Sequence, residues 1–209
     1  MDPRRERSAC GIGFVADAAG RTRRDVVEGA LEALRRLRHR GAVDADARTG
    51  DGAGVLVPLS RRFLAREAER LGLGRCEPER LGLAMAFDRA PEGRTDDVVA
   101  RACAAEGVSV LAWRDVPVRP AALGAVARAS MPRIRQALLL APAGLAPGQR
   151  EQRAHRARRR VERELRREGL ACSFPSFGFL TVTYKALAAA DQLEVFYPDL
   201  GDPLLEAPF

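Results

Sequence analysis

Apolar residues recur along this chain with two different periods, which together predict alternating helices and strands. From Arg23 to Arg38 the apolar positions fall every three or four residues, as in an amphipathic helix packed on a core. Ser60 precedes another such stretch and is expected to cap its first turn. Short apolar runs bounded by Gly, Pro or Asp predict strands. The expected strands are 10–16, 54–59, 81–87, 108–113, 133–141 and 178–184, and the expected helices are 23–38, 61–71, 95–106, 121–129 and 150–167.

The interleaving of strands and helices indicates one mixed α/β domain. The chain has 209 residues, of which 46% are hydrophobic, enough to bury a core without metal or disulfide support. Its loops are short, so none is expected to be a flexible linker between domains. No stretch approaches the roughly 20 apolar residues of a membrane span. The charged N-terminus lacks the apolar segment of a secretory signal, so we expect a cytoplasmic protein.

The chain is strongly basic, with a formal net charge of +7. This balance raises the expectation of nucleic-acid contact, and the densest basic run lies between Arg150 and Arg167. Glutamates interrupt that run at helical spacing, however, and 5% aromatic residues leave few surfaces on which bases can stack. We therefore interpret the run as a solvated helix face and disfavour nucleic-acid binding, with an RNA-binding module as the alternative.

The cysteines Cys10, Cys76, Cys103 and Cys172 lie far apart and form no CxxC pair. Zinc and thioredoxin-like sites are therefore not supported, and we expect free thiols and no metal centre. Cys10 differs from the others because it follows a short charged leader and two small residues. It fits either a buried strand cysteine or a nucleophile exposed at the N-terminus after residues 1–9 are removed.

A loop rich in glycine and aspartate is predicted between His39 and Gly54. Glycine permits positive φ and close approach of the backbone, and aspartate closes turns through its carboxylate. The loop lacks the Lys-Ser/Thr pair of a phosphate-binding loop. For Gly50–Gly54 we favour a packing role over direct contact with a substrate.

Several segments resemble one family in their order and spacing. Cys10 lies in Ala-Cys-Gly-Ile-Gly-Phe, Arg40 in His-Arg-Gly-Ala and Asp51 in Thr-Gly-Asp-Gly-Ala-Gly. This order resembles the start of the glutaminase domain of the glutamate synthase large subunit. Later segments agree with the resemblance: residues 113–118, 123–124, 130–132, 134–136, 181–185 and 196–200. The similarity extends over nearly the whole chain from Cys10.

The resemblance implies a class II glutamine amidotransferase of the N-terminal-nucleophile (Ntn) hydrolase type. The implied fold class is α+β, a four-layer αββα sandwich that would be incomplete here. Residues 1–9 would form a leader, and residues 10–209 would form part of the amidotransferase domain.

The same resemblance implies the site residues and the substrate. Cys10 would be the catalytic nucleophile, and Gly11, Arg40 and Gly41 would support the active site. The substrate would be L-glutamine, hydrolysed to glutamate and ammonia through a thioester on Cys10. The free α-amino group of that residue would act as the base, as it does in enzymes with an N-terminal nucleophile.

The chain departs from the family in the residues that would bind the substrate. The family's glutamine-binding arginine and its Asn-Gly oxyanion pair are expected beyond Phe209, and this chain contains no asparagine. Loss of one oxyanion donor costs roughly 100- to 1,000-fold in rate, so we expect this fragment alone to be weak or inactive. The alternative is a non-catalytic, amidotransferase-like piece with a role in assembly or regulation.

The resemblance also places the family's cofactors outside this chain. FMN and an iron–sulfur cluster are expected only in the missing synthase domains. The remaining part of glutamate synthase, as a separate chain, is therefore the protein partner that we expect.

Overall fold

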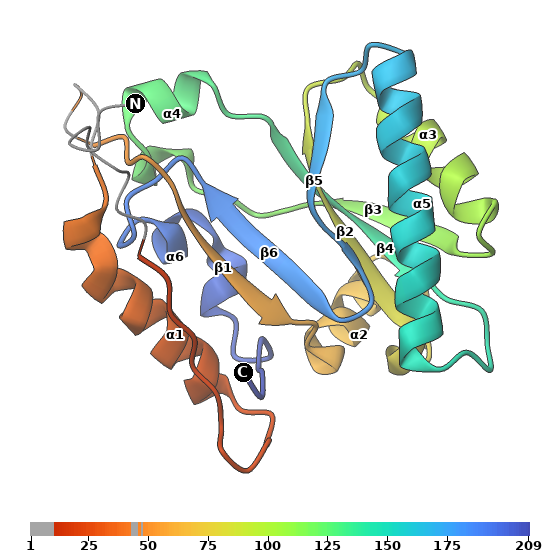
Figure 1. The fold of residues 1–209 in the computed structure, drawn as a ribbon, viewed down its shortest axis with the longest axis horizontal. Coiled ribbons are helices and arrows are strands. Elements are labelled where there is room, and N and C mark those ends of the chain that lie inside the picture. Colours follow the sequence, from red (N-terminus) through yellow and green to blue (C-terminus); the bar gives the residue numbers. More distant parts are fainter. Residues whose placement is uncertain (1–10, 43–45, 47) are drawn as a thin grey trace, which may run out of the picture.

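The computed structural model describes residues 11–42, 46 and 48–209. Figure 1 shows the strands crossing the middle of the molecule, with helices on both sides. The helices are α1 (Arg24–Arg36), α2 (Arg61–Arg70), α3 (Arg94–Ala104), α4 (Ala125–Ala129), α5 (Pro147–Arg167) and α6 (Leu193–Phe196). The 3-10 helices are η1 (Leu37–Arg40), η2 (Pro78–Arg80), η3 (Pro120–Ala122) and η4 (Pro198–Gly201). The strands are β1 (Ala53–Pro58), β2 (Leu81–Asp88), β3 (Ser109–Asp115), β4 (Arg133–Leu140), β5 (Cys172–Gly178) and β6 (Thr181–Ala186).

The larger sheet is four-stranded and antiparallel, in the order β3-β4-β2-β5. Helices α3 and α5 cover one of its faces (Figure 1). Ala84, Ala86 and Ala137 on that face are fully buried, and their small side chains let the helices lie close to the strands. Val99 of α3 and Val161 of α5 fill the same core. This face of the sheet is therefore closed to water.

The smaller sheet pairs β1 with β6 antiparallel, with Val55 opposite Tyr184 and Val57 opposite Val182. These four side chains share one face because side chains alternate along a strand. That face packs in a second core, where Tyr184 is fully buried. The opposite face carries Leu56, which is 56% exposed. Water therefore reaches one face of this sheet.

A buried group of charged residues fastens the two sheets together. Arg114 on β3 donates to Glu67 of α2 at 2.5 Å and also donates to Asp199 of η4. The hydroxyl of Tyr184 on β6 donates to the same Asp199 carboxylate at 3.0 Å. The four residues are all buried. The two terminal guanidinium nitrogens of Arg114 are thus paired with carboxylates, as burial of ionised groups requires, while its Nε has no hydrogen-bond partner.

The observed fold is mixed α+β with two antiparallel sheets, which agrees at that level with the α+β class implied by the family resemblance. The predicted basic helix 150–167 lies within α5, and Ser60 caps α2 by accepting from the Phe63 N–H at 3.3 Å. In the described part of the chain, no helix is both long and apolar enough to cross a bilayer.

One predicted strand is wrong over the residues that the structure describes. Residues 11–16 of the expected strand 10–16 form no strand, and Cys10 lies outside the described residues. Ile12 and Phe14 are 95% and 92% exposed. An alternating apolar pattern predicts a strand only if a neighbouring strand supplies the hydrogen bonds of the ladder, and none pairs with this segment among the described residues.

The region around Gly178 contains two strands where the sequence predicted one strand, 178–184. β5 ends at Gly178 and β6 begins at Thr181. Pro175 weakens the sequence pattern of β5, because proline is uncommon inside strands. The side chain of Phe179 in the connecting turn is buried in the core that α3 and α5 share, and its N–H donates to the Glu151 carboxylate of α5. These contacts reverse the chain and send it into the second sheet.

Candidate active site

A groove of about 800 Å³ lies beside the smaller sheet. Its walls come from residues 11–15, from α1, from β1 and β6, and from Phe209. Figure 1 shows the segment that leads into α1 running between that helix and β1. The lining is mainly apolar, and its polar side chains include Asp51, Thr183 and Lys185. Such a lining can hold a small polar molecule against an apolar wall.

Two of the four predicted site residues can be placed near this groove. Gly11 lines it and is exposed. Gly41 lies beside Asp51, because a Cβ built at position 41 would stand 3.2 Å from the Asp51 carboxylate, and Asp51 lines the groove. Arg40 ends η1, but its side chain is outside the described part of the structure. Cys10 also lies outside the described residues and immediately precedes Gly11.

The glycine-rich loop packs tightly against the segment that follows β6. A Cβ on Gly50 would lie 2.3 Å from backbone atoms of residues 188 and 189, closer than such atoms can approach. The N–H of Asp51 donates to the Ala42 carbonyl at 3.1 Å, which joins the two halves of the loop. This geometry supports the predicted packing role at Gly50, whereas residues 51–54 also line the groove, so contact with a substrate there stays an untested alternative.

Asp46 anchors the same loop. Its carboxylate accepts hydrogen bonds from the N–H groups of Arg48 at 2.9 Å and Thr49 at 2.6 Å, and from the Thr49 hydroxyl at 2.6 Å. These bonds hold the pKa of Asp46 well below its ordinary range. Gly124 stands against this turn, because a Cβ there would lie 2.2 Å from the Thr49 hydroxyl oxygen. The loop therefore rests on the start of α4, a partner that the sequence alone did not identify.

The family of the chain follows from comparison with known proteins. Residues 10–209 match the family described as glutamine amidotransferases class-II. The chain belongs to this family. The matched region begins at Cys10 and includes every predicted site residue.

Curated relatives of this class II amidotransferase chain are glutamate synthases. It is 35% identical over 218 residues, and over 100% of its own length, to the glutamate synthase (NADPH) large chain of Azospirillum brasilense. It is 37% identical over 203 residues, 95% of its length, to ferredoxin-dependent glutamate synthase 2 of Synechocystis sp.. These alignments cover 14% and 13% of the two relatives. The chain thus spans about one seventh of the length of these relatives.

Two segments that resemble the amidotransferase family meet in the core and not at the groove. Residues 113–118 supply Arg114 and residues 196–200 supply Asp199, which form the buried ion pair described above. The neighbouring Trp113 stacks under the Arg135 guanidinium, whose carbon lies 4.5 Å from the ring centroid. These contacts assign Arg114, Asp199 and Trp113 to holding the fold together.

The three described cysteines of the amidotransferase chain have no features of a nucleophile. Burial raises the pKa of Cys103 and of Cys172 to about 12, so both remain protonated thiols at neutral pH. Cys76 is half-buried, and all three are free. Among the described residues, no group of three or more His, Cys, Asp or Glu is placed to hold a metal ion.

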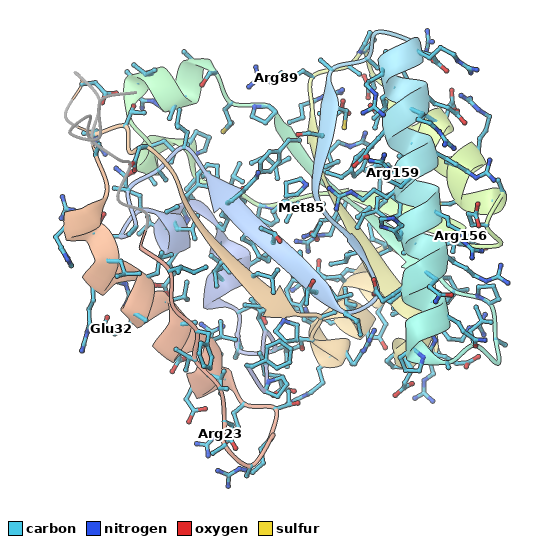
Figure 2. All side chains as sticks on the ribbon, viewed as in Figure 1. Arg23, Glu32, Met85, Arg89, Arg156 and Arg159 are labelled. Atoms are coloured by element: carbon cyan, nitrogen blue, oxygen red, sulfur yellow. The ribbon has the colours of Figure 1, made fainter. Side chains whose placement is uncertain are left out.

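Helix α5 carries the basic run of the amidotransferase chain, and several of its arginines pair with acidic side chains. Arg158 and Arg159 contact Glu162 at 2.9 Å and 3.0 Å, and Arg160 contacts Glu106 at 2.7 Å. Figure 2 shows Arg159 among the side chains on this helix. These pairs fit the solvated helix face that the sequence favours, and RNA binding stays an untested alternative.

Proposed function

We propose that this chain is the glutaminase portion of a glutamate synthase, with Cys10 as its nucleophile. The observation that carries the proposal is that the family match begins at a cysteine whose next residue, Gly11, lines an open groove. The identity of 35% to a glutamate synthase large chain supports the same function. L-Glutamine is the proposed substrate, since it is the nitrogen donor of the family.

In the proposed reaction, the Cys10 sulfur attacks the carbon of the glutamine side-chain amide. The α-amino group of Cys10, free once residues 1–9 are removed, accepts the thiol proton and passes it to the departing nitrogen. Ammonia leaves and a thioester remains, which water hydrolyses to glutamate while the thiol is restored. The ordinary pKa values of ~8.5 for the thiol and ~7.7–8.0 for the amine allow this exchange near neutral pH.

The surroundings of the groove suit a supporting role for the predicted neighbours of Cys10. The absence of a side chain at Gly41 allows the Asp51 carboxylate to lie close to the backbone, and the tight packing of Gly50 fixes the loop that carries Asp51. We propose that Arg40 and Gly41 shape the walls around the nucleophile. Gly11, which has no side chain, would leave room for the substrate to reach the Cys10 sulfur. A fixed wall helps to orient the amide for attack.

We further propose that the fold is part of a four-layer αββα sandwich. The coverage of the larger sheet by α3 and α5 supports one outer helical layer, and the contact of α1 with β1 places a further helix beside the smaller sheet. The groups that bind glutamine and its oxyanion would lie beyond Phe209, on the same or on a separate chain. The 14% coverage of the Azospirillum relative leaves ample length for them. FMN and an iron–sulfur cluster would belong to those other parts, in a cytoplasmic enzyme.

Ammonia release from L-glutamine tests the proposal in three forms of the protein. One begins at Cys10, one retains residues 1–9, and one begins at residue 10 with Cys10→Ser. The form that begins at Cys10 is expected to release ammonia at a rate at least about 100-fold below that of a complete domain, because the oxyanion donor is missing. The other two forms are expected to release none above buffer.

Other outcomes of that assay separate the alternatives. Equal release by the Cys10→Ser form would contradict the role of Cys10. Absence of release from all forms, together with a leader that is retained in cells, would favour a non-catalytic role in assembly or regulation. Cys76→Ser is the matched control, because Cys76 is a half-buried free thiol that does not line the groove.

A further inference from the structure

A second cavity, of about 450 Å³, opens where β2 ends and where β4 and β5 begin. Its floor is apolar and includes Phe87, Ile134 and Phe196, and Ala127 of α4 forms part of a wall. This volume is within the range of pockets that hold small molecules. The cavity adjoins the groove, since Phe87 and Lys185 line both.

Two cations face this cavity. Lys185, the only lysine in the sequence, places its Nζ 5.8 Å from the centroid of the Phe87 ring. Arg89 donates to the Ser130 carbonyl, and Figure 2 shows Arg89 between α4 and the tip of β5. Among the described residues that line the cavity, none is Asp or Glu. A positive rim above an apolar floor attracts an anion that has an apolar body.

The acidic residue next to Arg89 along the chain does not neutralise this rim. Asp88 is 1% exposed, and its carboxylate accepts from the Ala90 N–H at 2.9 Å and from the Thr95 hydroxyl at 3.0 Å. It also accepts from Arg133 at 3.0 Å. The negative charge of Asp88 is therefore compensated by Arg133 and by these hydrogen bonds, and Asp88 does not line the cavity.

Segments that resemble the family but have no part in the proposed mechanism meet at this cavity. Leu123 belongs to the segment 123–124, Met131 to 130–132 and Lys185 to 181–185, and all three side chains line it. They come from three separate parts of the chain. Their convergence on one cavity gives these segments a common location that the attack by Cys10 does not require.

We propose that this cavity binds a small carboxylate that carries an apolar body. The carboxylate lies at the rim, where it accepts hydrogen bonds from Arg89 and Lys185, and the apolar part lies against Phe87 and Phe196. Hydrogen bonds between charged partners are stronger than neutral ones, so the two cations set the preference for an anion. The site uses no atom of Cys10. The proposal for this cavity can therefore be tested independently of the proposed glutaminase function.

A matched pair of probes tests the charge preference by isothermal titration calorimetry. 4-Phenylbutyrate carries a carboxylate on an apolar body, and 4-phenylbutylamine carries an ammonium on the same body. The carboxylate is expected to bind at least about tenfold more tightly than the amine. Equal affinity for the two probes, or no binding of the carboxylate, would overturn the proposal.

Variants of the rim test which residues set that preference. Arg89→Gln and Lys185→Gln are each expected to weaken 4-phenylbutyrate binding by about tenfold, because each removes one charged donor. Arg156→Gln is the control, since Arg156 is exposed on α5, remote from the cavity lining. Unchanged affinity in both rim variants would refute the assignment.

A cysteine in the cavity reports where the probe binds. Cys172 lines the cavity, whereas Cys76 is a half-buried thiol elsewhere. Burial raises the pKa of Cys172 to about 12, so its labelling by iodoacetamide is slow even at about pH 9 and is followed over hours by mass spectrometry of the peptides. 4-Phenylbutyrate is expected to slow labelling of Cys172 and to leave Cys76 unchanged. Protection of neither cysteine, or of both equally, would contradict this location.

Discussion

The two sheets of this molecule differ in how they are covered. The larger sheet carries α3 and α5 on one face and the second core on the other, and Leu139 within it is fully buried. The smaller sheet has one face in that core and one face in water, where Leu56 is 56% exposed. The groove lies along the smaller sheet. The comparison shows that the larger sheet is covered on both faces, while the open face of the smaller sheet lies beside the groove where chemistry is proposed.

Among the substitutions considered, the largest loss in the free energy of unfolding is expected at Arg114, which connects the two sheets. Arg114→Ala would leave Asp199 buried without its arginine, whereas Glu67 would keep its contacts with Arg66 and Arg70. We expect a cost of about 3–5 kcal/mol in the free energy of unfolding. Chemical denaturation measures this change. Arg156→Ala, an exposed change on α5, is expected to alter stability by less than about 0.5 kcal/mol. A loss below about 1 kcal/mol for Arg114→Ala would show that the ion pair does not fasten the sheets.

A matched pair of leucine truncations compares the sheets directly. Leu139→Ala in the covered sheet is expected to cost about 2–5 kcal/mol, because it leaves a cavity in a closed core. Leu56→Ala on the open face is expected to cost no more than about 0.5 kcal/mol. Both values come from the same denaturation experiment. Similar losses for the two variants would mean that the open face is covered in solution.

The smallest change in stability is expected from protonation of Asp46, in the loop beside the groove. The pKa of Asp46 is lowered by the hydrogen bonds that its carboxylate accepts, so these bonds contribute stability above the ordinary aspartate pKa of about 4. That contribution is lost as the pH falls from about 4 toward the lowered pKa. Amide chemical shifts of Thr49 and Val126, both donors to Asp46, are expected to change in this range. Asp46→Asn should abolish the transition, and its persistence in that variant would assign it to another group.

The sequence predicted the elements that pack on a core better than those that depend on a distant partner. The periodicity of α1 and the apolar run of β2 are local, so both could be identified from the residues. The strand expected at 10–16 needs a neighbour that no local pattern supplies. Similarly, β5 was missed because Pro175 obscures its alternation, although pairing with β2 makes it a strand.

In the candidate site, too, local features could be predicted from the sequence, whereas contacts between distant residues could not. The glycine-rich loop was predicted to pack because glycine has a local physical meaning, and the contact at Gly50 agrees. The pairing of Arg114 with Asp199 joins residues 85 positions apart, so no spacing rule could reveal it. The second cavity is likewise built from segments that become neighbours only in the folded chain. The role of Cys10 came from family resemblance and remains a prediction.

The most direct test of the central claim is the identity of the first residue in the protein isolated from the cells that produce it. N-terminal sequencing, supported by intact mass, reads this residue without assuming any activity. The account predicts that the chain begins at Cys10, with its amino group free to act as the base. A preparation that hydrolyses glutamine while still beginning at Met1 would contradict it.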